Sequence, residues 1–211
     1  MAIYAESSGG SQRELIPAGN YVARCYQMLH IGTVEETILG ETKKLNKVRI
    51  GFELPGELRV FKEENGEQPI VISKEFTLSM HEKSSLRQVL KSWRGKDFTE
   101  EEAKKFDIVK LLGIPCMLNV IHKPSKKDTS KVYEEISSIT PLPKGFTCPM
   151  QINSDQELNY DNFNQTLFDS LPDFLKNKIK SSDEYRSMIN PHEREINNQV
   201  PAGADEDDLP F

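Results

Sequence analysis

The sequence has few cysteines and no long hydrophobic run. Cys25, Cys116 and Cys148 are the three cysteines among 211 residues, too few and too scattered for a disulfide framework. The longest apolar-rich stretch, residues 111–121, is much shorter than the roughly 20 residues that a membrane-spanning helix needs. The first residues show no basic start followed by an apolar run, so no secretory signal is expected. We therefore expect a cytoplasmic protein without a membrane partner.

The sequence also lacks the short motifs that mark several classes of enzyme. It contains no Walker A phosphate loop, no G-x-S-x-G elbow and no H-E-x-x-H zinc motif. Cys25 with His30, and Cys116 with His122, are the pairs that come closest to a zinc site. On strands, the first pair falls on opposite faces and the second is about 20 Å apart. We therefore expect no enzyme, no metal and no cofactor.

The acidic residues are concentrated in the C-terminal third. The whole chain has a net charge of −6. Residues 1–141 contain 21 Lys and Arg against 20 Asp and Glu, a net charge of +1, whereas residues 142–211 contain 6 against 13, a net charge of −7. The acidic total therefore does not exclude a nucleic-acid-binding surface on the first two thirds of the chain.

Alternating hydrophobicity predicts strands in the first half of the chain. Residues 46–54 alternate and place Lys47 and Arg49 on a basic outer face. Residues 36–45 predict a polar connection before this strand, and Pro55 with Gly56 predicts a turn after it. A third strand is expected over residues 70–80. An earlier strand is expected over residues 21–31, and strict alternation gives it one face made of Tyr21, Ala23, Cys25, Gln27, Leu29 and Ile31.

Helical periodicity follows after residue 80. The apolar residues at helical spacing are Leu86, Val89, Leu90 and Trp93. Ser84 or Ser85 is expected as the N-cap of this helix, and Gly95 marks its C-terminal end. Thr99 and Glu102 form a capping box that opens a second short helix through residue 106. Strands resume at residues 115–122 and 132–140, joined by a polar loop rich in lysine.

The order of these elements predicts a mainly β fold with minor α. Three strands, a helical segment and two further strands occur between residues 19 and 141. This order resembles the oligonucleotide/oligosaccharide-binding (OB) barrel, a five-stranded Greek-key barrel that in many members carries a helix between strands three and four. Other small α+β folds share this order of elements.

Four segments are expected along the chain. Residues 1–18 predict a flexible N-terminal arm, and residues 19–141 the OB-fold barrel. Residues 142–181 predict an extension, first extended and then with two short helices separated by Pro172. Hydrophobic residues nearly vanish after residue 181, so residues 182–211 predict a disordered acidic tail.

The last seven residues carry the sharpest motif in the chain. They are Asp205, Glu206, Asp207, Asp208, Leu209, Pro210 and Phe211. This run resembles the acidic tip of bacterial single-stranded DNA-binding proteins, with Leu209 where those have isoleucine. A terminal aromatic can enter an apolar pocket beside a basic residue, while the acids steer it towards basic partners. The resemblance implies that the tip binds partner proteins, and the alternative is a solubilising tail.

The body of the chain carries a second resemblance. The stretches NYVARCYQMLHIGT, LNKVRIGFELP, SWRGKDFTEEEAKKFD, LLGIPCMLNVIHK and ITPLPKGFTCP are similar to a family of phage and prophage-encoded OB-fold proteins assigned to single-stranded DNA binding. The resemblance covers roughly residues 17–185. It implies a protein of DNA replication or recombination in a bacterial host cell that binds single-stranded DNA, recruits replication or recombination proteins through the tip, and can form homo-oligomers.

A sequence-tolerant single-strand binder needs cations along the backbone path and aromatic faces for the bases. The candidates on the expected outer faces and loops are Arg24, Tyr26, Lys47, Arg49, Phe61, Lys74, Trp93, Arg94, Lys123, Lys126, Lys127, Lys131 and Tyr133. The spacing of Trp93 is typical of a core residue. For each basic residue, the simpler interpretation is that it lies on a solvated face of the protein.

Two other functions fit the same sequence. The barrel can be a protein-interaction module that binds no DNA. A third interpretation is a small nuclease or an accessory enzyme of recombination. Titration of labelled oligo(dT) against duplex DNA, with and without divalent metal, separates the three.

Overall fold

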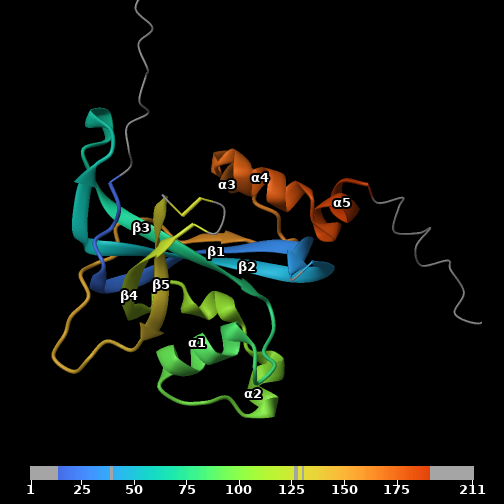
Figure 1. The fold of residues 1–211 in the computed structure, drawn as a ribbon, viewed down its shortest axis with the longest axis horizontal. Helices are drawn as coiled ribbons and strands as arrows, with labels where there is room; N and C mark the ends of the chain where they lie inside the picture. The colour runs from blue at the N-terminus through green and yellow to red at the C-terminus, as the bar shows by residue number, and fades with distance from the viewer. Residues whose placement is uncertain (1–13, 39, 126–127, 130, 191–211) are drawn as a thin grey trace, which may run out of the picture.

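The fold is mainly β with a few short helices, as the sequence predicts. The computed structural model describes residues 14–38, 40–125, 128–129 and 131–190. Its long strands are β1 (Gly19–Ile38), β2 (Glu41–Val60), β3 (Glu67–Thr77), β4 (Pro115–Pro124) and β5 (Val132–Thr140). Neighbouring strands are antiparallel and follow the order β3-β2-β1-β4-β5 (Figure 1). A short strand, β6 (Gln156–Leu158), pairs with β1 in parallel.

The two end strands of this path approach each other. The Lys74 ammonium of β3 donates a hydrogen bond to the Ile136 carbonyl of β5 and lies 3.4 Å from the Glu135 carboxylate. Side chains therefore connect β3 to β5, where the strand path itself ends. This strand order, with a helix between β3 and β4, is that of a partly open OB barrel.

β1 and β2 are longer than the sequence pattern predicts. Within the expected polar connection at residues 36–45, residues 36–38 and 41–45 are paired strand, in which Glu36 lies opposite Lys43 and, next to it, Glu35 lies opposite Lys44. Such opposite charges support a polar hairpin that has no apolar alternation. The expected turn at Pro55 is also strand, with a register shift between residues 54 and 58 that accommodates the proline.

A second irregularity changes the faces of β1. The register shifts between Cys25 and Gln27, so strict alternation fails at this point. Ala23, Cys25 and Met28 belong to the barrel core, whereas Leu29 and Ile31 belong to a second cluster outside the barrel. The predicted common face is therefore split between two cores.

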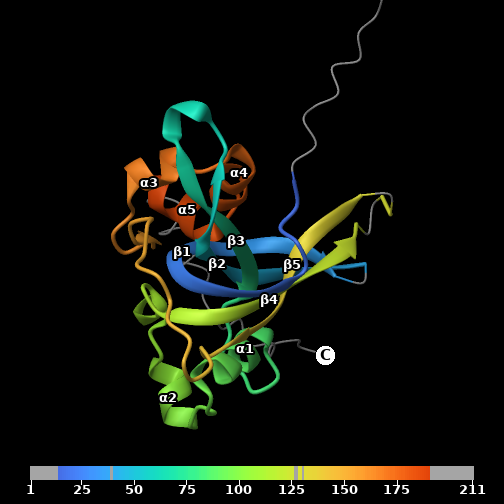
Figure 2. The same cartoon turned by 90° about the vertical axis from the view of Figure 1, so that its left-hand side faces the viewer.

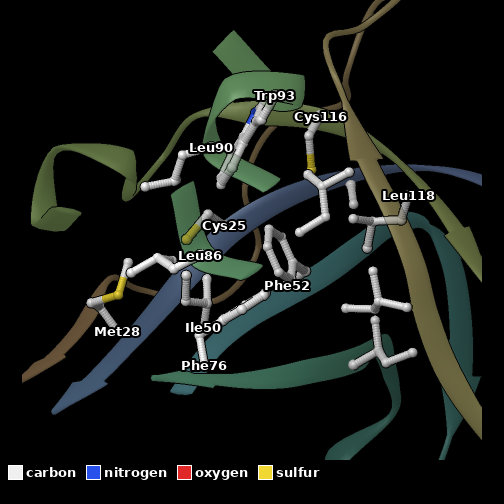
Figure 3. Packing of buried hydrophobic residues seen from close by; sticks show 14 of the residues in the cluster. Cys25, Met28, Ile50, Phe52, Phe76, Leu86, Leu90, Trp93, Cys116 and Leu118 are labelled. Carbon is white, nitrogen blue, oxygen red and sulfur yellow. The ribbon is translucent and has the colours of Figure 1, made fainter. Parts of the chain in front are cut away.

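Helix α1 (Ser85–Arg94) covers one end of the barrel core. Its Trp93 is 5% exposed and packs against Phe52, with ring centroids 5.6 Å apart (Figure 3). The indole nitrogen of Trp93 donates to the Pro115 carbonyl at 3.1 Å. Trp93 is therefore a core residue, and the structure excludes it as a platform for stacked bases.

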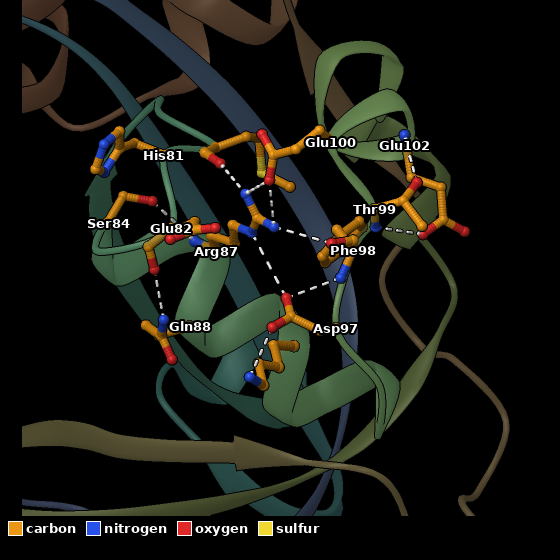
Figure 4. A network of polar contacts seen from close by, with 12 residues as sticks. His81, Glu82, Ser84, Arg87, Gln88, Asp97, Phe98, Thr99, Glu100 and Glu102 are labelled. Atoms are coloured by element: carbon orange, nitrogen blue, oxygen red, sulfur yellow. Dashed lines mark hydrogen bonds and ion pairs between the residues drawn. The ribbon is translucent and has the colours of Figure 1, made fainter.

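The capping predictions for this region are confirmed. The Ser84 hydroxyl accepts from the Arg87 amide, and Gly95 adopts a left-handed conformation with φ of 74°. Helix α2 (Glu100–Lys105) opens with the predicted capping box of Thr99 and Glu102. The buried Arg87 guanidinium joins the two helices through the Phe98 carbonyl and the Glu100 carboxylate (Figure 4). A 3-10 turn, Ile108–Leu111, leads into β4.

The chain after β5, residues 141–155, runs back along the barrel as an extended segment that we call the strap. The Glu53 carboxylate, completely buried, accepts from the backbone amides of Ile152 and Asn153, each at 2.8 Å. Arg24 donates to the Gly113 and Pro149 carbonyls, which fixes the same strap to the start of β4.

Three helices then pack against the outer face of β1, on the side of the barrel away from α1 and α2 (Figures 1 and 2). They are α3 (Gln165–Ser170), α4 (Asp173–Lys180) and α5 (Asp183–Ile189). The Glu184 carboxylate of α5 accepts from the Thr33 amide and hydroxyl at 2.5 and 2.7 Å. Gly32 allows this approach, because its φ is 90° and an added Cβ would lie 2.6 Å from the Glu184 carboxylate. The expected start of the tail at residue 182 is therefore wrong, since polar contacts hold α5 where hydrophobicity is low.

The expected N-terminal arm is also shorter than predicted. Ile16 is 1% exposed and belongs to the barrel core, and its carbonyl accepts a hydrogen bond from His122 at 2.7 Å. The Glu14 carbonyl accepts from Arg59 at 3.1 Å. Residues 14–18 are thus part of the folded unit. No helix in the described part of the chain is long and apolar enough to span a membrane.

Candidate nucleic-acid interface

A groove lies over the outer faces of β2 and β3. It has a volume of about 540 Å³ and is closed on one side by α4 and on another by the start of β5. In Figure 2 the β2–β3 hairpin lies in front of the C-terminal helices, and the β4–β5 hairpin projects to the right. We call this the outer groove and define it by Glu14, Tyr26, Arg49, Arg59, Phe61, Val71, Tyr133, Glu134 and Phe174.

Three exposed aromatic side chains converge on the outer groove from separate elements. Phe61, at the end of β2, is 58% exposed; Tyr133 of β5 is 41% exposed; and Phe174 of α4 is 60% exposed. Exposed apolar side chains that gather in one patch mark interaction sites, whereas single exposed ones do not. Stacked nucleobases use such faces at about 1–3 kcal/mol per base.

Two arginines lie among these rings. The Arg49 guanidinium lies over the Phe174 ring, 5.7 Å from its centroid, and 3.6 Å from the Glu75 carboxylate. Burial lowers the pKa of Arg49, so its charge is incompletely solvated in the free protein. Arg59 lies 3.5 Å from the Glu14 carboxylate.

The groove is less basic than the sequence predicts. The charged residues that line it are Arg49, Arg59, Glu14 and Glu134, whose formal charges cancel. The feature of the outer groove that suits a nucleic acid is therefore its group of aromatic faces and not a net positive charge.

Tyr26 lies in the groove but does not present its ring face. It is 9% exposed, and burial raises its pKa to about 12, so its hydroxyl is neutral at physiological pH. This side chain forms part of the groove floor and can contribute an edge contact or a hydrogen bond. Stacking of a base on it is excluded by its burial.

The predicted lysines on the β4–β5 hairpin lie next to Tyr133. Lys123 is paired with Glu135 at 2.9 Å, and this contact holds the pKa of the Glu135 carboxyl below its usual value. Lys131 has a side chain that is 79% exposed and lies 3.6 Å from Asp128. Lys126 and Lys127 lie outside the described residues. The Lys74 ammonium lies between β3 and β5, where it donates to the Ile136 carbonyl and the Glu135 carboxylate.

Four further candidates do not line the outer groove. Arg24 anchors the strap, as described above, and Trp93 is in the core. The Lys47 ammonium pairs with Glu36 at 3.0 Å, and the Lys47 side chain is 11% exposed. Arg94 pairs with Glu102 at 2.6 Å beside α1. Sequence reasoning placed these cations on surfaces, but specific carboxylates or carbonyls bind them.

Sequence reasoning missed Arg59 and Phe174 as groove residues. Arg59 lies beyond the point where β2 was expected to end, so no alternation assigned it to a face. Phe174 precedes Leu175 and Ile179, which are buried on the inner side of α4. The spacing of those two apolar residues leaves Phe174 off the buried stripe, and this signal could have identified it.

The predicted tip has no structural test, because residues 205–211 lie outside the described residues. Within the described ranges, no group of three or more His, Cys, Asp or Glu side chains is arranged to hold a metal ion.

The chain was compared with family models, curated proteins and solved structures, and none of them matches it.

Proposed function

We propose that the protein binds single-stranded DNA without strong sequence preference and that the outer groove is the binding site. The observation that carries this proposal is the convergence of Phe61, Tyr133 and Phe174 on one groove of an OB-type barrel. OB barrels commonly bind oligonucleotides across the outer faces of strands two and three and the adjacent loops. The outer groove occupies the corresponding faces of β2 and β3.

The chemistry of the groove favours unpaired bases. An aromatic ring can stack on a base only when the base is unstacked from its neighbours, which is the state of a single strand. Stacking does not depend on base identity because every base has a π face. Arg49 and Arg59 supply donors for phosphate oxygens between the rings, and a phosphate can replace the Glu14 or Glu75 carboxylate as their partner.

The lysines of the β4–β5 hairpin extend this surface. Lys123 and Lys131 lie on the hairpin that carries Tyr133, and Lys126 and Lys127 lie between them in sequence. Cations in this region release counterions from the strand, with a slope of about −0.7 per phosphate in a plot of log affinity against log salt. Replacing all four lysines with alanine is expected to make this slope shallower.

The acidic segment 205–211 completes the proposal. We infer that it recruits other proteins of replication or recombination in a bacterial cell, in keeping with the family resemblance of the tip. Four adjacent acids followed by Leu209, Pro210 and Phe211 suit a basic partner with an apolar pocket. The role is non-enzymatic and requires no cofactor.

Fluorescence anisotropy with labelled oligo(dT) tests the proposal. We expect binding to a single strand that weakens with salt and exceeds binding to duplex DNA of the same length. An interaction module without DNA binding predicts no anisotropy change with either probe. A nuclease predicts shortening of the oligonucleotide when divalent metal is added, which gel electrophoresis of the same samples detects.

A further inference from the structure

A second pocket lies beside α1, away from the outer groove. It has a volume of about 370 Å³, which is within the range of ligand sites. We call it the α1 pocket and define its apolar lining by Leu90, Trp93, Phe98, Phe106, Ile114 and Leu142. The two pockets share no lining residue, so occupation of one leaves the other free.

The α1 pocket has a buried apolar floor and a partly open apolar edge. Leu90, Trp93 and Phe98 are each at most 5% exposed, whereas Ile114 at the rim is 43% exposed. Arg87 fixes the Phe98 carbonyl and Glu100, so the loop that forms one wall is held in place (Figure 4). This pocket is thus preformed and suits an apolar side chain larger than a methyl group.

Two cations stand at the edge of the α1 pocket. Arg94 lies over the Phe98 ring, 4.6 Å from its centroid, and shares its charge with Glu102. Lys110 is exposed and forms no ion pair with any residue that the structure describes. The pocket therefore offers apolar surface next to a positive charge that still lacks a counterion.

We propose that residues 205–211 of the same chain dock in the α1 pocket. Leu209, Pro210 and Phe211 would fill the apolar floor, and the acids of residues 205–208 would face Lys110 and Arg94. This segment has four acids directly followed by three apolar residues. The acids match the cations at the edge of the pocket, and the apolar residues match its floor. The docking does not depend on nucleic-acid binding.

The chain is long enough for this contact. Leu209 follows Asn190 by nineteen residue steps, which can span about 65 Å when extended. A compact chain of 211 residues has a radius of gyration of about 17 Å. The segment can therefore pass from the end of α5 to the opposite side of the barrel, where α1 lies (Figure 1).

Trp93 provides a single reporter for this contact. It is the only tryptophan in the sequence and lines the α1 pocket. The full chain labelled with 5-fluorotryptophan is expected to give one fluorine NMR signal whose position depends on docking. Phe211→Ser should shift this signal because the apolar anchor is lost, whereas Val200→Ser, which lies before residues 205–211, should leave it unchanged.

A charge reversal at the edge of the α1 pocket provides an independent test. Lys110→Glu should move the Trp93 signal towards its position in Phe211→Ser. In the double variant, Phe211→Ser should then shift the signal much less than it does in the wild type. Lys105→Glu, a matched reversal at a residue that does not line the pocket, should do neither. High salt should act in the same direction as Lys110→Glu.

Three results would overturn the proposal. The first is an identical Trp93 signal in the wild type and in Phe211→Ser, which includes the case where the segment docks in the outer groove. The second is an effect of Phe211→Ser that persists undiminished in the Lys110→Glu background. The third is a signal that changes on dilution of the protein, because that result assigns the contact to a second copy.

Discussion

The Arg49 guanidinium of β2 lies over the Phe174 ring of α4, with 5.7 Å between the guanidinium carbon and the ring centroid. The same helix is tied to β3 by Lys178, which donates to Glu75 at 2.6 Å. Glu75 in turn lies 3.6 Å from Arg49. These contacts make the C-terminal extension a wall of the outer groove, so the groove exists only when α4 is docked.

The first prediction concerns the aromatic ring of this wall. Phe174→Ala should weaken oligo(dT) binding by about 5- to 150-fold, which corresponds to about 1–3 kcal/mol for one lost stacking face. The fold should be retained, because the ring is 60% exposed. Anisotropy titration and urea unfolding of the same variant separate the two effects. Wild-type oligo(dT) affinity in this variant would show that α4 is not part of the binding site.

The second prediction concerns the anchor of the strap. Glu53→Ala should lower the free energy of unfolding by about 2–4 kcal/mol, since the buried amides of Ile152 and Asn153 lose their acceptor. Glu57→Ala, at an exposed position on the same strand, serves as the control and should change it by about 0.5 kcal/mol or less. Equal stability of the two variants in urea would show that the strap is not fixed by Glu53.

The third prediction separates the core from the candidate site. Trp93→Phe should destabilise the fold by about 2–3 kcal/mol through the lost hydrogen bond to Pro115 and the smaller ring. Oligo(dT) affinity of the folded variant should stay close to that of the wild type, because Trp93 is 5% exposed and does not line the outer groove. A large loss of oligo(dT) affinity without loss of stability would show that Trp93 belongs to the binding site.

The fourth prediction concerns acid pH. Partial burial alone would raise the pKa of Glu36, but hydrogen bonds from Lys47 and Lys178 outweigh it and lower that pKa below the ordinary value of 4.5. A carboxyl whose pKa is lower in the folded state stabilises the fold above its ordinary pKa. That stabilisation is lost as the pH falls through the lowered value. Unfolding in urea between pH 7 and pH 3 should therefore depend less on pH in Glu36→Gln than in the wild type.

Local sequence signals predicted the elements that local forces determine. The caps at Ser84, Gly95 and Thr99 were predicted correctly because a cap depends on a few adjacent residues. The order of strands around α1 was predicted for a similar reason, since each strand carries its own pattern. The split of the β1 faces after Cys25 was not predicted, because a bulge inserts one residue without a distinct composition.

The candidate site was predicted only in part, and the reason is tertiary. Arg49, Phe61 and Tyr133 were identified individually as exposed residues, and the structure brings them to one groove. The cation Lys47 resembles Arg49 in the sequence, yet Glu36 binds it away from the groove. Which of two similar cations lines the groove depends on contacts with distant segments, and a single-sequence pattern contains no information about them.

The most direct measurement compares two phenylalanines of equal exposure. Phe61 and Phe146 are each 58% exposed, but Phe61 lines the outer groove and Phe146 does not. Their alanine variants, titrated against the same labelled oligo(dT) at one salt concentration, are matched in the surface that they remove. Our account predicts a loss of about 5- to 150-fold in affinity for Phe61→Ala and affinity within twofold of wild type for Phe146→Ala. Equal affinity of the two variants, or no binding of oligo(dT) by the wild type, would contradict it.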